Sequence, residues 1–235
     1  FLENVFPYMD NYNYQKGMKE IIQELKNFLK PKDIGTDSDR ALLLDFQATL
    51  ETKPEKAIKL EKDALAQIEN ITADNARLVS NLHANLGGLY RMNGHPDLAR
   101  EHMEKSISLL DQFNLLHIND SIPQIANYAM FLTEQQEPER GISELQKLSG
   151  IIKEYHSDDC LDYAKVQETL ATIYLMTASL SQAKSHFKKA FKIYEKIWAD
   201  EPELIEAKYQ EIQELYPQVG FFLGQQISTF LTKQL

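Results

Sequence analysis

The most restrictive feature of this chain is an internal repeat of 42 residues. Three proline–acid pairs follow one another at this spacing: Pro54-Glu55, Pro96-Asp97 and Pro138-Glu139. Proline in the first turn of a helix loses no intrahelical hydrogen bond, and an acidic neighbour is stabilised by the positive end of the helix dipole. The pairs therefore predict three equivalent helix starts.

Small residues recur with the same period, which indicates helices that pack closely in pairs. One column lies near the start of each expected second helix: Ala57, Ala99, Gly141 and Ala183. Another lies on each expected first helix and is small in all repeats but the first: Asp45, Gly87, Ala129 and Ala171. Stacked helix pairs of this kind bury one continuous core. The fold class predicted is an all-α solenoid of antiparallel helix pairs.

The period divides the chain into four repeats and two flanks. The repeats are expected at 38–79, 80–121, 122–163 and 164–205. Residues 1–37 are expected to form a degenerate repeat or cap, and residues 206–235 to form capping helices, because the end repeats of a solenoid are commonly atypical. The apolar stretch 219–235 has two interpretations: it covers the last repeat, or it forms a homodimer interface.

The repeats resemble the tetratricopeptide repeat family, whose pattern is Leu-Gly-x-x-Tyr followed by Ala-x-x-x-Phe. The second repeat matches at Leu86, Gly87, Tyr90, Ala99 and Met103, and the fourth at Leu170, Ala171, Tyr174, Ala183 and Phe187. HEAT and armadillo repeats have similar lengths, but these columns favour the tetratricopeptide family. The long repeat is similar to that of kinesin light chains and of peptide-responsive bacterial regulators. The resemblance implies a right-handed superhelix whose concave groove is lined by the first helices.

The resemblance also implies a peptide-binding groove that contains a repeated asparagine. Asn85 and Asn127 are one repeat apart, and in the resembling proteins an asparagine at this place contacts the backbone of an extended peptide. An amide side chain suits this task because it both donates and accepts hydrogen bonds. An alternative interpretation is that both asparagines are solvated or bond a neighbouring helix. The other expected groove residues are Asn81, Arg91, Leu42, Phe46, Met130, Lys165, Glu168 and Thr172.

The function predicted is a non-catalytic scaffold that binds a protein or peptide segment in this groove. The alternative is a ligand-sensing regulatory domain of a larger regulator, with a DNA-binding or nucleotide-hydrolysing domain elsewhere. The absence of a methionine before Phe1 fits a fragment of such a regulator, and equally a processed start.

Catalytic and metal-binding motifs are missing from the sequence. It has neither a phosphate-binding glycine loop nor a His-Glu-x-x-His pair, so we expect no enzyme, metal or cofactor. Gly87 and Gly88 are explained by close helix packing. Cys160 lies near His156, but we expect a loop there in which Asp158 or Asp159 caps the next helix.

Charge and hydropathy exclude further classes of partner. With 25 basic and 35 acidic side chains the net charge is −10, which argues against nucleic acid because phosphate contacts need clustered Lys and Arg. The chain has no membrane-length apolar run and does not begin like a signal peptide. We therefore expect a cytoplasmic protein without membrane contact.

Overall fold

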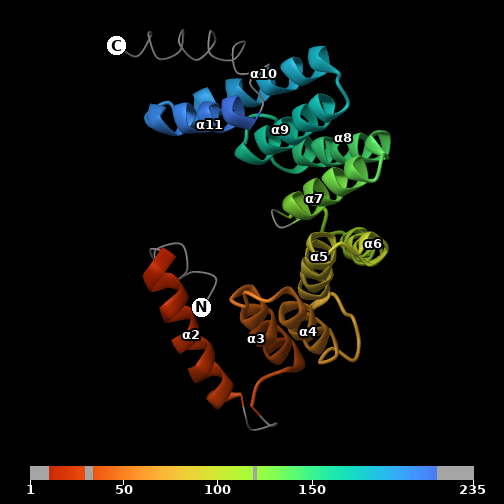
Figure 1. Ribbon diagram of the computed structural model, residues 1–235, viewed down its shortest axis with the longest axis vertical. Coiled ribbons are helices and arrows are strands. Elements are labelled where there is room, and N and C mark those ends of the chain that lie inside the picture. The colour runs from red at the N-terminus through yellow and green to blue at the C-terminus, as the bar shows by residue number, and fades with distance from the viewer. Residues whose placement is uncertain (1–10, 30–33, 119–120, 216–235) are drawn as a thin grey trace. The chain divides into compact units, whose positions relative to one another are not determined.

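The computed structural model describes residues 11–29, 34–118 and 121–215, and these residues lie in helices or in the turns, bends and loops that connect them (Figure 1). The predicted all-α fold class is confirmed for this part of the chain. The helices are α2 (Asn11–Phe28), α3 (Asp37–Thr49), α4 (Pro54–Leu65), α5 (Ala76–Met92), α6 (Pro96–Gln112), α7 (Ser121–Glu134), α8 (Pro138–Tyr155), α9 (Leu161–Met176), α10 (Leu180–Ile197) and α11 (Pro202–Leu215).

The helices fall into two compact units, divided between Leu115 and Leu116. In the first unit α3 pairs with α4 and α5 with α6, and α2 packs on α3. In the second unit α7 pairs with α8 and α9 with α10, and α11 packs on α10. The first helices of neighbouring pairs also touch, α3 with α5 and α7 with α9. The exact residues at which one repeat ends and the next begins stay a prediction.

The prolines mark helix starts, as predicted. Pro54, Pro96 and Pro138 stand in the first turns of α4, α6 and α8. The turn before each second helix also repeats from the second repeat on. It contains a residue with left-handed backbone conformation every 42 residues, with φ of 75° at Gly94, 65° at Gln136 and 57° at Ala178. Only the first of these is a glycine, so the repeat maintains the turn even where the side chain disfavours it.

The small-residue columns are sites of close helix approach. A Cβ added to Gly87 on α5 would lie 2.6 Å from Met103 Cγ on α6, and one added to Gly141 on α8 would lie 2.6 Å from the Ala129 carbonyl oxygen on α7. The packing interpretation is wrong for Gly88, because a Cβ there would have no atom within 4 Å. Close approach therefore explains the first glycine of the pair and not the second.

The loop before α9 is capped differently from our expectation. Cys160, and neither Asp158 nor Asp159, occupies the N-cap position, and its Sγ accepts a hydrogen bond from the backbone N–H of Tyr163 at 3.4 Å. The thiol also donates to the Ser157 carbonyl oxygen at 3.2 Å. The sulfur thus takes the place of the side-chain oxygen of the usual Ser or Asp cap, and both of its hydrogen bonds are to the backbone of the same loop and helix start.

Two sequence predictions lie outside the described residues. These are the part of the capping helices expected beyond residue 215, and the apolar stretch 219–235 with its two interpretations, a cover for the last repeat or a homodimer interface. No helix in the described ranges has the length and apolar character needed to cross a membrane.

Candidate functional site

Asn85, the first of the repeated asparagines, ties three helices of the first unit together. Its side chain is exposed on α5. Its Nδ2 donates to Asp45 Oδ1 on α3 at 2.9 Å and to Glu61 Oε1 on α4 at 3.2 Å. This is the bond to a neighbouring helix that the sequence left open as an alternative. A contact between Asn85 and a peptide backbone stays a prediction.

The acceptors of Asn85 are two acids, Glu61, which is buried, and Asp45, which is half-buried. Glu61 is only 2% exposed, and its Oε2 has no hydrogen-bond donor around it in the described part of the chain. Burial, with the neighbouring Asp45 charge, raises the pKa of Glu61 to about 9, and burial also raises the pKa of Asp45. At neutral pH the Glu61 carboxyl therefore keeps a proton, which it donates to Asp45.

The repeat pattern shows what this acid pair replaces. Asp45 stands one period before Gly87, and Glu61 one period before Met103. The corresponding pairs in the other repeats are small against large and apolar: Gly87 with Met103, Ala129 with Leu145, and Ala171 with Phe187. The first repeat has thus exchanged an apolar contact for a hydrogen-bonded polar one.

Leu42 and Phe46 lie on α3, opposite α2. They line an apolar cleft of about 230 Å³ together with Leu25 and Phe28 of α2. Below the cleft, Leu43 is buried against Met18 and Ile22. The apolar surface expected at the groove end is thus shared with the N-terminal helix.

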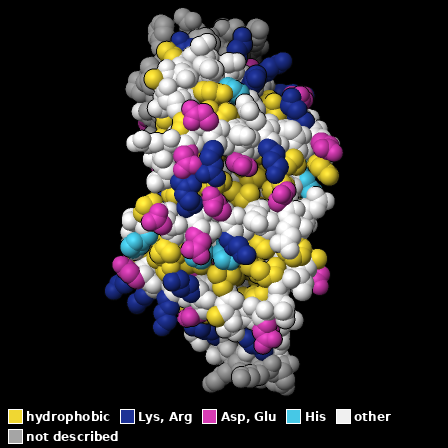
Figure 2. Space-filling model, turned by 90° about the vertical axis from the view of Figure 1, so that its right-hand side faces the viewer, with side chains coloured by type: hydrophobic (Ala, Val, Ile, Leu, Met, Phe, Trp, Pro, Cys, Tyr) yellow, Lys and Arg dark blue, Asp and Glu magenta, His cyan; other side chains and the backbone are white. Residues whose placement is uncertain are grey.

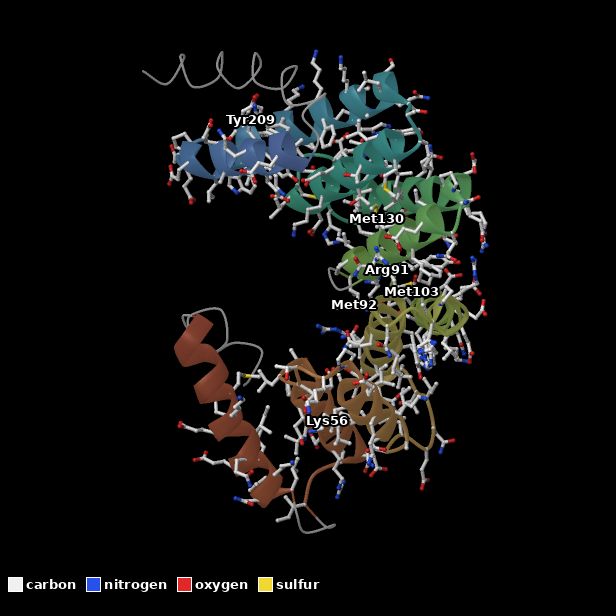
Figure 3. The ribbon with its side chains drawn as sticks, viewed as in Figure 1. Lys56, Arg91, Met92, Met103, Met130 and Tyr209 are labelled. Carbon is white, nitrogen blue, oxygen red and sulfur yellow. The ribbon has the colours of Figure 1, made fainter. Side chains whose placement is uncertain are left out.

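Asn81 and Arg91 lie on α5, and both are half-buried. Arg91 is next to Met92, which is 82% exposed at the end of the helix (Figure 3). Neither residue lines the Leu42–Phe46 cleft, so a shared ligand site stays a prediction.

The second unit brings five predicted groove residues onto neighbouring first helices. Asn127 and Met130 lie on α7 (Figure 3), and Lys165, Glu168 and Thr172 lie on α9. Asn127 and Lys165 are exposed, whereas the other three are half-buried. Since α7 touches α9, the five residues lie on adjacent helices, and one surface shared by their side chains stays a prediction.

Glu168 is already engaged within the protein. Its Oε2 accepts from the Tyr194 hydroxyl at 2.6 Å, and its Oε1 accepts from Lys208 Nζ of α11 at 3.1 Å. Burial by itself lowers the pKa of Lys208, but the charges of Glu168 and Glu211 outweigh burial and raise it. Thr172 donates to the Glu168 backbone carbonyl oxygen at 3.1 Å. Glu168 therefore fastens α11, a role that the sequence pattern did not indicate.

A histidine hydrogen bond between paired helices, which the sequence motifs did not indicate, occurs twice, two repeats apart. His102 Nδ1 lies 2.9 Å from His83 Nδ1, and His186 Nδ1 lies 2.9 Å from Gln167 Oε1. Tyr90 stacks on the first of these pairs, as Tyr174 does on the second, with ring centroids 5.4 and 5.3 Å apart. Burial lowers the pKa of His83 and of His186 to about 4.

Gln167 occupies in the fourth repeat the position that His83 occupies in the second. Because a glutamine can replace this histidine, we infer that the contact is a structural hydrogen bond between paired helices. The shared spacing of 84 residues was the signal that could have found it. In the described ranges no three His, Cys, Asp or Glu side chains gather to hold a metal ion.

These packed pairs of antiparallel helices, repeated at a fixed period, define an α-helical repeat protein of the solenoid class. The tetratricopeptide repeat family model matches residues 121–196. That segment is therefore similar to tetratricopeptide repeats, and the chain has the fold of TPR-like repeat proteins, including those of the kinesin light chain type.

Solved structures share the fold at low sequence identity. BtubC (BKLC) from P. vanneervenii is 16% identical, with 94% of this chain and 90% of that chain covered and a TM-score of 0.71. A putative kinesin light chain with nearly identical TPR-like repeats from Podosopora anserina is 14% identical, with 80% and 92% covered and a TM-score of 0.64. MamA is 17% identical, with 80% and 97% covered and a TM-score of 0.54. No curated protein matches the sequence.

Proposed function

We propose that this chain is a non-catalytic scaffold, located in the cytoplasm, that binds an extended peptide segment of a partner protein. The fold is one that suggests a protein-interaction scaffold. The binding surface that we propose lies on the first helices of the second unit, α7 and α9, around Asn127, Met130 and Lys165.

The observation that carries the proposal is the contrast between the two asparagines. The amide nitrogen of Asn85 is engaged with Asp45 and Glu61. The Asn127 side chain is exposed, and within the described residues it has no hydrogen-bond partner. One amide thus serves the fold, and the equivalent amide one repeat later is available to a ligand.

The neighbours of Asn127 suit a peptide ligand. An amide can donate to a peptide carbonyl and accept from a peptide N–H, whatever the side chains of the peptide. Met130, half-buried beside it, offers a flexible apolar contact. Lys165 is exposed on α9, with Asp162 3.8 Å away on the same helix, and supplies a charge that an acidic side chain or a carboxyl terminus can pair with.

The test is to select binding peptides from a displayed library on the immobilised full chain, and then to measure variants with one selected peptide. Asn127→Ala should weaken binding about tenfold, because two hydrogen bonds to the peptide backbone are lost. Asn85→Ala is the matched control, and it should change the affinity less than twofold while lowering the melting temperature of the first unit. An Asn85→Ala, Asn127→Ala double variant with full affinity would refute the proposal.

A further inference from the structure

The strongest charge feature of the described surface lies on α10, a second helix, away from the proposed peptide surface on α7 and α9. This helix carries five lysines and one glutamate, a net charge of +4 in a chain of net charge −10. Figure 2 shows Lys and Arg side chains exposed at the height that α10 has in Figure 1. The lysines are Lys184, Lys188, Lys189, Lys192 and Lys196.

The repeat fold does not demand this charge, because the equivalent helices of the other repeats lack it. Basic and acidic residues balance in α4 and in α8, and α6 has a net charge of −2. One period before Lys188 and Lys192 stand Gln146 and Gly150 of α8. Lys147 and Lys105 stand at the position of Lys189 in the third and second repeats, so what is specific to the fourth repeat is the combination of five lysines with a single acid on one helix.

The lysines share one face of the helix. At 100° per residue they fall within an arc of about 140°, and the buried Ala183, Phe187 and Ala190 lie outside that arc. Three pairs of lysines are four residues apart, an arrangement in which like charges repel and weaken a helix. A fold that needed only a solvated surface here would gain from acids at some of these positions.

The middle of this face is open. Lys188, Lys189 and Lys192 are exposed, and none of them has an ion-pair partner within residues 11–29, 34–118 and 121–215. At the end of the face Lys196 pairs with Asp159. Burial lowers the pKa of His186, and the positive charge of Lys189 lowers it further. Three unneutralised positive charges therefore stand side by side.

The spacing of these charges fits an extended acidic peptide. Residues four apart on a helix are separated by about 6 Å along its axis, and alternate residues of an extended chain by about 6.6 Å. Lys188 and Lys192, which have no ion-pair partner in the described part of the chain, thus match acidic side chains two positions apart in such a segment.

A protein segment fits better than nucleic acid or a lipid surface. All five positive charges are lysines, whereas arginine is the residue that grips phosphate with two hydrogen bonds. The next helix, α11, is acidic, with four glutamates and one lysine, and it would repel a wide polyanion.

We propose that the lysine face of α10 is a docking surface for an acidic, extended segment of a partner protein. This surface is separate from the one around Asn127 and goes beyond the proposed function. It offers a second contact for the same partner or a contact for a different one.

The probe is a fluorescein-labelled Ser-Glu-Ser-Glu-Ser-Glu-Ser peptide, titrated with the full chain at about 50 mM salt, where surface charges are weakly screened. Lys188→Gln, Lys189→Gln, Lys192→Gln should weaken binding about tenfold, because three exposed ion pairs are lost. The matched control is Lys53→Gln, Lys56→Gln, Lys59→Gln, which removes the same charge from exposed lysines of the first unit and should change the affinity less than twofold. Replacement of the three α10 lysines by arginine should retain binding.

Two further measurements separate this surface from the alternatives. Asn127→Ala should leave binding of the glutamate peptide unchanged, so the two proposals can fail independently. Equal weakening by both glutamine triples, or by neither, would overturn the docking surface. Tighter binding of duplex DNA or of phosphatidylserine vesicles than of the peptide would also overturn it.

Discussion

The acid pair of the first repeat predicts that alkaline pH destabilises the first unit. Unfolded Glu61 loses its proton near its ordinary pKa of 4.5, whereas burial keeps the native carboxyl protonated up to about pH 9. Between these values the native state binds one proton more than the unfolded state, so the free energy of unfolding falls as the pH rises. The contribution is fully present below pH 4.5 and is lost as the pH rises towards 9. Glu61→Gln should remove this dependence, because a neutral amide can donate to Asp45 at any pH.

The size of the effect follows from linkage. One proton changes the free energy of unfolding by about 1.4 kcal/mol per pH unit. Between pH 7 and pH 8.5 the loss is roughly 2 kcal/mol, which for a unit of about 100 residues lowers the melting temperature by on the order of 10 °C. This window lies above the titration of the unfolded histidines, so their buried native forms do not obscure it.

The assay must distinguish the two units. The only tryptophan, Trp198, stacks on Tyr194 in the second unit at 4.7 Å, so its fluorescence follows that unit. Circular dichroism at 222 nm follows the helices of both units. We expect the dichroism transition assigned to the first unit to shift with pH in the wild type and not in Glu61→Gln, while the Trp198 transition is the same in both.

The refuting result is equally concrete. If wild type and Glu61→Gln lose the same stability between pH 7 and pH 8.5, Glu61 is ionised in the native state and the shared proton does not exist. A second variant tests whether the result depends on the glutamine amide that Glu61→Gln introduces. Asp45→Ala with Glu61→Leu copies the Ala129–Leu145 contact of the third repeat and should also abolish the pH dependence, with unchanged or higher stability at pH 8.5.

Two further predictions concern the helix contacts. Gly141→Ala should destabilise the second unit by about 1–3 kcal/mol, because the added Cβ would clash with the Ala129 carbonyl oxygen. The Cβ added by Gly150→Ala on the same helix has no atom within 4 Å, so this variant should stabilise the unit by up to about 1 kcal/mol. Urea unfolding followed by Trp198 fluorescence compares the two variants, and equal effects would contradict the packing argument. The low pKa of His83, about 4 against 6.5, means that the unfolded state binds more protons between these values and that stability falls as the pH drops below 6.5. His83→Gln, which copies Gln167, should therefore spare up to about 2 kcal/mol of the loss between pH 6.5 and pH 5 in dichroism-monitored unfolding, and an unchanged loss would contradict it.

The helix starts and the close contacts could be predicted because they depend on backbone chemistry that repeats. Pro96 begins a helix for the same reason as Pro138, and Gly87 is small because Met103 lies against it. Such constraints act at every repeat, so the sequence shows them several times. A feature that occurs once, such as the Cys160 cap, leaves no periodic trace, and the sequence pointed to the neighbouring aspartates instead.

The candidate site was harder to predict, because the partner of a polar side chain is set by packing across helices. Asn85 and Asn127 are indistinguishable by position, yet one of them bonds two carboxyls that only the first repeat possesses. Glu168 matches a groove position by its number in the repeat, but α11 brings Lys208 to it from outside the repeats that define the period. The repeat specifies where a side chain lies, and its neighbours decide whether it is free.

The departures from the repeat are therefore the best guide to what distinguishes this chain from others of its fold. Asp45 with Glu61 replaces an apolar contact that the other repeats retain, and the replacement fixes Asn85. The lysine face of α10 replaces the balanced charges of α4 and α8. The first departure is buried and so acts through stability, whereas the second is exposed and costs helix stability through like-charge repulsion of roughly 0.2–0.5 kcal/mol per pair. Because Lys188, Lys189 and Lys192 have no ion-pair partner among the described residues, this cost is what we expect of a binding surface for an oppositely charged partner.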